Sequence, residues 1–116
     1  MFNIDYSSRA PIYEQIIKQI ERYVALGVLK PSEQIPSIRD MATLLGINPN
    51  TVSKAYTILE GNGIIKTLST KGTFITDKTS AVVKNKVNDI LTDIEEKMEE
   101  LIKLGLTKEE ILKRLK

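Results

Sequence analysis

The chain has 116 residues, 41% hydrophobic and 28% charged, enough for one ordinary domain with an appended element but not for a large multidomain enzyme. Its 17 Lys and Arg against 15 Asp and Glu leave a net charge of +2, too little for indiscriminate attraction to polyanions. The lack of Cys and His excludes disulfides, common zinc sites, thiolate nucleophiles and imidazole bases. We therefore expect no metal and no other cofactor.

The first strong helical pattern runs from about Pro11 to Leu26. Proline suits the first helical position, where its missing N–H would have no intrahelical partner, and Gly27 is a suitable stop. Apolar residues recur every four positions, at Ile12, Ile16, Ile20 and Val24. This period predicts one buried helix face. Pro31 and Pro36 keep the following stretch out of helix.

Two further helices are predicted on either side of a short turn. One begins after Ser37, a capping residue with an acid three positions further on, and ends at Gly46. The other begins at Pro49, with Asn48 as its N-cap, and extends to about Glu60. Their expected buried positions are Ile38, Met41, Ala42 and Leu45, and Val52, Ala55, Tyr56 and Leu59.

A β-hairpin is predicted next. Two β-prone runs, Ile64–Leu68 and Thr73–Thr76, flank the short loop Ser69–Gly72. The expected fold class is therefore mainly α with a small β-hairpin.

The turn between the second and third predicted helices has the features of a helix-turn-helix. That motif needs a small residue where the helices meet and a glycine in the turn. Ala42 and Gly46 supply these, and Val52 supplies the first buried position of the following helix. A generic helical hairpin has similar residues, but the hairpin that follows favours a winged helix.

The outward face at the start of the third predicted helix is polar and free of acids. If Val52, Ala55, Tyr56 and Leu59 are buried, the residues pointing outward are Asn50, Thr51, Ser53, Lys54 and Thr57. A recognition helix has its base-reading residues in this position, and Asn, Thr and Lys can each contact base edges. Such residues also occur on any solvated helix, so composition alone does not decide between the two interpretations.

Three separated motifs carry a specific resemblance. They are Pro11–Ile16, then Ile35–Ala42 with Gly46–Tyr56, and finally Lys71–Ile75. Over about residues 8–77 the chain resembles the winged-helix domain of the GntR family of bacterial transcriptional regulators. The resemblance implies a partner, double-stranded DNA, and a wing tip at Lys71 and Gly72. We expect the DNA contacts to come from Ser37, Arg39, Asn48, Pro49, Asn50, Thr51, Ser53, Lys54, Tyr56, Thr57, Thr70, Lys71 and Gly72.

Several of these residues have a plainer interpretation. Arg39 matches the family arginine that approaches DNA, but it could instead form a surface salt bridge with Asp40 or Glu33. Asn48 could be only a helix cap. Tyr56 is expected chiefly to pack in the core, with its hydroxyl within reach of a phosphate.

Two positions depart from the family pattern. Many relatives have Gly-Arg-Gly at the wing tip, whereas this chain has Thr70-Lys71-Gly72. The turn is less permissive, and a strongly hydrated ammonium replaces the arginine that favours narrow minor grooves. A plain hairpin turn is the alternative there. Ser32 stands where glycine is common, with little functional consequence expected.

The last third of the chain differs in composition. Residues 1–78 carry nine Lys or Arg and seven Asp or Glu with every proline and aromatic, whereas residues 79–116 carry eight of each sign and neither residue type. We expect a winged-helix domain at 1–78 and a helical tail at 79–116, with one helix from about Ala81 to Leu104. Thr107 to Glu110 matches a capping box for a last short helix.

The long tail helix has an apolar stripe, for which a second copy of the chain is the simplest partner. The expected dimer contacts are Val83, Val87, Ile90, Leu91, Ile94, Met98, Leu101 and Ile102. Packing back onto the winged helix is the alternative. The 38 residues from Thr79 onward are too few for the effector or aminotransferase-like domains of larger relatives. The short tail resembles that of the YtrA subfamily, in which it implies dimerisation.

These patterns together indicate a homodimeric, sequence-specific transcriptional regulator, a repressor in preference to an activator, on a pseudo-palindromic operator. We expect a cytoplasmic protein without a membrane partner, since no apolar run approaches about 18 residues and the start lacks a signal-peptide layout. Whether it has a small-molecule effector is left open. The alternative function is a winged-helix protein–protein interaction module without specific DNA binding. An enzyme is disfavoured because it would need paired carboxylates in a pocket.

Overall fold

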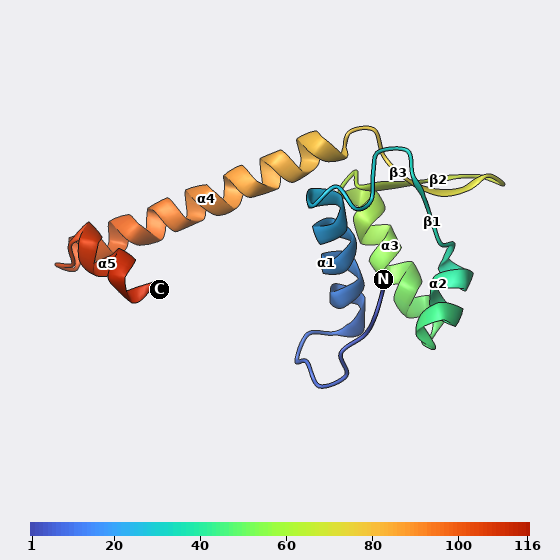
Figure 1. The fold of residues 1–116 in the computed structure, drawn as a ribbon, viewed down its shortest axis with the longest axis horizontal. Coiled ribbons are helices and arrows are strands. Elements are labelled where there is room, and N and C mark those ends of the chain that lie inside the picture. The colour runs from blue at the N-terminus through green and yellow to red at the C-terminus, as the bar shows by residue number, and fades with distance from the viewer. The chain divides into compact units, whose positions relative to one another are not determined.

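Five helices and three short strands follow one another in the computed structural model, which describes residues 1–116 (Figure 1). In chain order they are α1 (Ile12–Ala25), β1 (Gln34–Ile35), α2 (Ile38–Leu45), α3 (Pro49–Gly61), β2 (Ile65–Leu68), β3 (Gly72–Ile75), α4 (Thr79–Lys103) and α5 (Lys108–Arg114). The chain divides into two compact units, Met1–Val83 and Lys84–Lys116. The first unit contains the predicted winged helix-turn-helix together with the start of α4. No helix of the chain is long and apolar enough to cross a membrane.

The helix ends lie within about two residues of their predicted positions. Pro11 is the N-cap of α1 and not its first helical residue, because its ψ of 151° is extended. Ser37 caps α2, its hydroxyl accepting a hydrogen bond from the Asp40 N–H at 3.1 Å. The side chain of Asn48 caps α3 in the same way, accepting from the Asn50 N–H at 2.8 Å.

The sheet has three strands, one more than the predicted hairpin. β1 pairs antiparallel with β3, with Gln34 opposite Phe74 and Ile35 opposite Thr73, so the strand order is β1-β3-β2. Two residues are too few to show the alternating pattern from which a strand is predicted. The third strand ties the segment before α2 to the wing.

One apolar core holds the first unit together. α1 packs against α3, and α2 packs against the other side of the α3 N-terminal half (Figure 1). The buried core residues of this unit are Ile16, Ile20, Leu29, Ile35, Met41, Ala42, Val52, Ala55, Tyr56, Leu59, Ile64, Ile65 and Ile75. Every buried position predicted for the third helix is among them, so its opposite face is left to solvent.

The turn between α2 and α3 is as tight as predicted. Gly46 has φ 67° and ψ 37°, the left-handed conformation in which glycine meets no Cβ penalty. The Ile47 N–H then donates to the Ala42 carbonyl at 3.0 Å. Ala42 and Val52 are 4% and 0% exposed, so the small residue and the first buried position lie as a helix-turn-helix requires.

The N-terminal segment belongs to the fold, which the sequence patterns did not predict. Phe2 and Ile4 pack against the core, and the Phe2 ring meets the Tyr23 ring edge-on at 5.6 Å between centroids. The Tyr23 hydroxyl donates to the Met1 carbonyl at 2.7 Å. The N-terminal segment therefore packs against α1 as part of the same domain.

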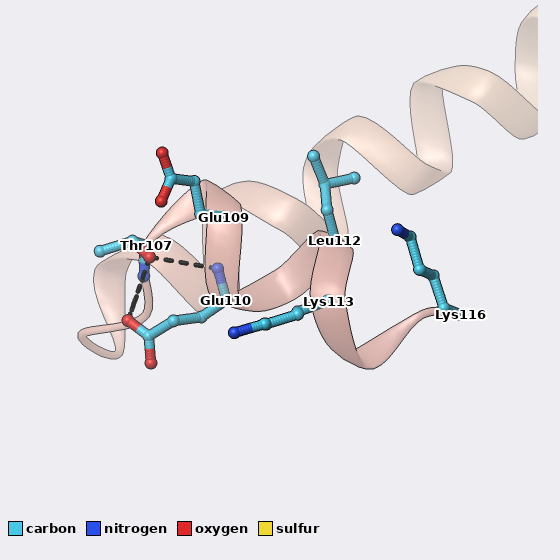
Figure 2. A pocket seen from close by; sticks show the side chains of 6 residues that line it. All are labelled: Thr107, Glu109, Glu110, Leu112, Lys113 and Lys116. Atoms are coloured by element: carbon cyan, nitrogen blue, oxygen red, sulfur yellow. Dashed lines mark hydrogen bonds between the residues drawn. The ribbon is translucent and has the colours of Figure 1, made fainter.

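The second unit consists of most of α4 with α5. The predicted capping box of α5 is present: the Glu110 N–H donates to the Thr107 hydroxyl at 3.2 Å, and the Thr107 N–H donates to the Glu110 carboxylate at 3.1 Å (Figure 2). Ile111, only 3% exposed, packs α5 onto α4. The two helices leave a largely apolar groove lined by Ile90, Asp93, Ile94, Lys97, Met98, Leu101, Ile111 and Leu115.

Candidate nucleic-acid interface

α3 presents one polar stripe to solvent. Asn50, Ser53 and Thr57 are three and four positions apart, which places them on one face of the helix, opposite the buried residues. Asn50 and Thr57 are exposed and Ser53 is half-buried, whereas Thr51 lies half-buried at the side of this face. The amides and hydroxyls of this stripe both donate and accept hydrogen bonds, as contact with base edges requires.

The start of α3 is suited to an anion. No acidic residue occurs in its first turn, Pro49 occupies the first position, and both Asn48 and Pro49 are exposed. A helix N-terminus carries partial positive charge, which favours a nearby phosphate. The Asn48 cap and a phosphate contact are therefore compatible at this end of the helix.

Lys54 lies on the side of α3 that faces α1. Its ammonium sits over the ring of Tyr13, 4.0 Å from the ring centroid, which is a cation–π contact. The position of its ammonium is thus set by a residue of another helix, a contact that the sequence patterns did not predict.

Tyr56 lies inside the domain and not on its surface. It is 4% exposed, and its hydroxyl donates to the Pro36 carbonyl at 2.7 Å. Burial raises the pKa of this hydroxyl, so it stays neutral. Because the single hydroxyl hydrogen is used within the protein, the expected phosphate contact gives way to the packing role, which links α3 to the segment before α2.

α2 contributes exposed polar groups beside α3. Ser37 and Arg39 are both exposed, and Arg39 forms no salt bridge with Asp40 or Glu33. The Glu33 carboxylate instead accepts a hydrogen bond from the Lys30 N–H at 3.1 Å. The Arg39 guanidinium is therefore free to meet a DNA backbone.

The wing is a tight hairpin whose tip is exposed. The Lys71 N–H donates to the Leu68 carbonyl at 2.7 Å, and Ser69 has a positive φ of 33°. Thr70 and Lys71 are exposed, and Gly72 has φ +119°. The side-chain amide of Gln34 in β1 donates to the Lys71 carbonyl at 3.3 Å, so the third strand also supports the tip.

Ser32 shows why glycine suits its position. Its φ of 66° is left-handed, a conformation disfavoured for residues with a Cβ. Its N–H donates to the Ile75 carbonyl at 2.9 Å and its hydroxyl donates to Asp77. These contacts offset the backbone strain and hold the approach to β1 against the end of the wing.

The predicted dimer residues are mostly exposed on α4. In the second unit, Val87, Ile90, Leu91, Ile94, Leu101 and Ile102 are each between 37% and 51% exposed, and Met98 is half-buried in the α4–α5 groove. Val83 is half-buried and lies at the end of the first unit. The stripe thus remains largely unpaired in a single chain.

Sequence reasoning did not single out two residues that contact candidate interface residues, Tyr13 beside Lys54 and Gln34 beside Lys71. Tyr13 lies within the Pro11–Ile16 motif, which was the available signal, but the motif does not show what its ring contacts. Gln34 carries no pattern at all.

Three helices with a tight helix-turn-helix and a three-stranded sheet that carries the wing define a winged helix-turn-helix domain. The family model described as bacterial regulatory proteins, gntR family, matches residues 12–75. The chain belongs to the GntR family of DNA-binding transcriptional regulators, which are not enzymes.

Similar proteins place it in the YtrA-like part of that family. The HTH-type transcriptional repressor YtrA of Bacillus subtilis is 44% identical over 102 residues, covering 88% of this chain and 76% of that protein. A transcriptional regulator from Oenococcus oeni has a solved structure with a TM-score of 0.77 at 40% identity, covering 97% of this chain and 93% of that one. YtrA from Sulfolobus acidocaldarius gives a TM-score of 0.64 at 36% identity, covering 80% and 95%.

Proposed function

We propose that this regulator is a cytoplasmic, homodimeric repressor that acts on a pseudo-palindromic operator. The observation that carries the proposal is the exposed, acid-free stripe Asn50, Ser53 and Thr57 on α3, with Arg39 and Lys71 on neighbouring elements. The name of the Bacillus subtilis relative supports repression.

In this proposal α3 enters the major groove and its stripe meets base edges. Asn50 is the strongest candidate for a base-specific contact, because an amide can pair bidentately with adenine. Lys71 on the wing and Arg39 on α2 contact phosphates or the adjacent minor groove. The net charge of +2 suggests few phosphate contacts and thus a moderate salt dependence.

Selection of bound sequences from random DNA tests the DNA-binding part and supplies an operator. On that operator, Asn50→Ala should weaken binding by about 1–3 kcal/mol and relax preference at one base pair. Lys71→Ala should weaken binding to operator and random DNA alike and reduce the salt slope by about one. Equal losses on operator and random DNA for Asn50→Ala would overturn base readout by this residue.

The dimer is assigned to the apolar stripe of α4. Two copies bound to adjacent major grooves would read half-sites about one helical turn apart, roughly 10 bp. Ile94→Glu places a charge in the stripe and should yield monomers in analytical ultracentrifugation, with loss of cooperative operator binding. Thr92→Glu adds the same charge outside the stripe, at a residue whose hydroxyl donates to the Asn88 carbonyl, and should leave the dimer intact.

Repression is tested by transcription in vitro from a promoter that overlaps the selected operator. The protein should lower the amount of transcript, and Asn50→Ala should restore it. An increase in transcript on adding the protein would identify an activator instead.

A further inference from the structure

We propose that Tyr13 of α1 is a positioning residue that directs Lys54 to the DNA backbone and not to a base edge. The inference rests on the proposed DNA-binding role of α3. It assigns a function to Tyr13, and it narrows the role of Lys54 from base or phosphate contact to phosphate contact.

The geometry of the pair carries the first step. The Lys54 ammonium lies 4.0 Å from the centre of the Tyr13 ring, well within the range of a cation–π contact. Tyr13 is half-buried and packs against the core, so its ring is a fixed platform, whereas Lys54 is exposed. The Tyr13 ring therefore determines the position of the Lys54 ammonium.

The location of the pair carries the second step. Lys54 follows Asn50 by four residues on the exposed face of α3, but its ammonium rests on the Tyr13 ring of α1, at the flank of that face. A helix in the major groove meets bases along its central face and meets the sugar–phosphate backbone along its flanks. A cation fixed at the α1 flank is thus placed for a phosphate.

Holding the side chain in place also affects affinity. A free lysine loses rotamer freedom when it binds, and a platform that restricts it beforehand reduces this loss. Restricting one long, flexible side chain before binding corresponds to roughly a two- to fivefold change in the binding constant. We expect the loss of the Tyr13 ring to weaken DNA binding by about this factor, on any sequence.

A double-mutant cycle on the full chain tests the proposal, using the selected operator and a random duplex. Lys54→Met should weaken binding to both duplexes by the same factor and reduce the salt slope by about one. Tyr13→Leu should weaken binding to both duplexes roughly two- to fivefold. Tyr13→Phe keeps the ring and should bind like the wild type. In the Lys54→Met background, Tyr13→Leu should have no further effect.

Two controls separate this effect from damage to the fold. Tyr6→Leu removes an exposed tyrosine that lies outside the interface and should leave binding unchanged. Thermal unfolding followed by circular dichroism should show each variant folded at the assay temperature. Only the binding constants of variants that are folded there enter the double-mutant cycle.

Three results would overturn the inference. They are a loss of preference at one base pair in Lys54→Met, a loss in Tyr13→Phe as large as in Tyr13→Leu, and additive losses in the double variant. The second result would mean that the hydroxyl, which donates to the Glu14 carboxylate at 3.5 Å, and not the ring carries the effect. If the wild-type protein selects no sequence at all, the proposed function fails as well; if it does and the cycle shows no coupling, this inference alone fails.

Discussion

The side-chain amide of Gln34 lies in the space that a β-carbon on residue 72 would occupy. An ideal Cβ built on Gly72 would be 2.5 Å from the Gln34 Nε2, and Gly72 has a φ of +119°. The same Nε2 donates to the Lys71 carbonyl at 3.3 Å. The glycine next to the wing-tip lysine therefore serves both the turn and the approach of β1.

Gly72→Ala should destabilise the domain by about 1–3 kcal/mol, because alanine is strained at this φ and its methyl group displaces the Gln34 amide. Adding Gln34→Ala to this variant should recover the stability lost through the clash with the Gln34 amide, but not the stability lost through the strained φ. Urea unfolding measures both. Gly61→Ala is the control, because that glycine has no positive φ and no neighbour within 4 Å of a built Cβ. It should raise stability by up to about 1 kcal/mol.

Ser32→Gly should change the free energy of unfolding by less than about 1 kcal/mol. It relieves the left-handed strain but loses the hydroxyl contact to Asp77 and gains freedom in the unfolded chain. Ser32→Ala keeps the strain and loses the same contact, so it should be the less stable of the two. An alanine variant more stable than the glycine variant in urea unfolding would contradict the left-handed conformation.

Asn48→Ala should lower stability by about 0.5–2 kcal/mol, because the Asn50 N–H loses its capping partner. Asn48→Asp retains the cap, and its charge is favourable at a helix N-terminus, so stability should be kept. Operator binding by Asn48→Asp should nevertheless weaken, since the carboxylate would repel phosphates. Thermal unfolding and a binding titration on the same samples separate the two effects, and unaltered operator binding by Asn48→Asp would place this residue away from the backbone.

Tyr56→Phe should cost about 0.5–1.5 kcal/mol of stability at neutral pH, through loss of the hydrogen bond to Pro36. Its operator affinity should match the wild type, since the hydroxyl is used inside the protein. A clear loss of operator affinity in the folded Tyr56→Phe variant would instead support a contact between the hydroxyl and a phosphate.

The difference between wild type and Tyr56→Phe should also depend on pH. Burial raises the pKa of Tyr56 above its ordinary value of 10.0, so the folded state holds this proton more tightly than the unfolded state. The hydroxyl's contribution is complete below about pH 10 and declines as pH rises further. In urea unfolding, the free energy of unfolding of the wild type should exceed that of Tyr56→Phe by less at pH 11 than at pH 8. The other tyrosines are present in both proteins, so their titration cancels in this difference.

Most of the fold follows from local sequence signals. Ser37, Gly46 and Asn48 mark helix ends through their own backbone and side-chain chemistry, and the four-residue apolar period selects the buried faces. The outward stripe of α3 could therefore be predicted as well. β1 could not, because a strand of two residues exists only through its pairing with β3.

The contacts that hold the candidate interface residues in place depend on tertiary packing. Lys54 reaches Tyr13 only because α1 packs beside α3, and Gln34 reaches Gly72 only because β1 joins the sheet. Each pair joins segments far apart in the sequence, and none of the residues carries a periodic signal. Tyr56 shows the same limit, since its period predicts burial but not the hydroxyl's partner.

The packing of the first residues bears on how a minimal DNA-binding fragment should be designed. The family match begins at residue 12, so a fragment cut at that boundary would lack Phe2 and Ile4. It would uncover the α1 surface that they contact and remove the acceptor of the Tyr23 hydroxyl. A fragment beginning at Met1 should stay folded and monodisperse, whereas one beginning at Ile12 should aggregate through the newly exposed helix face.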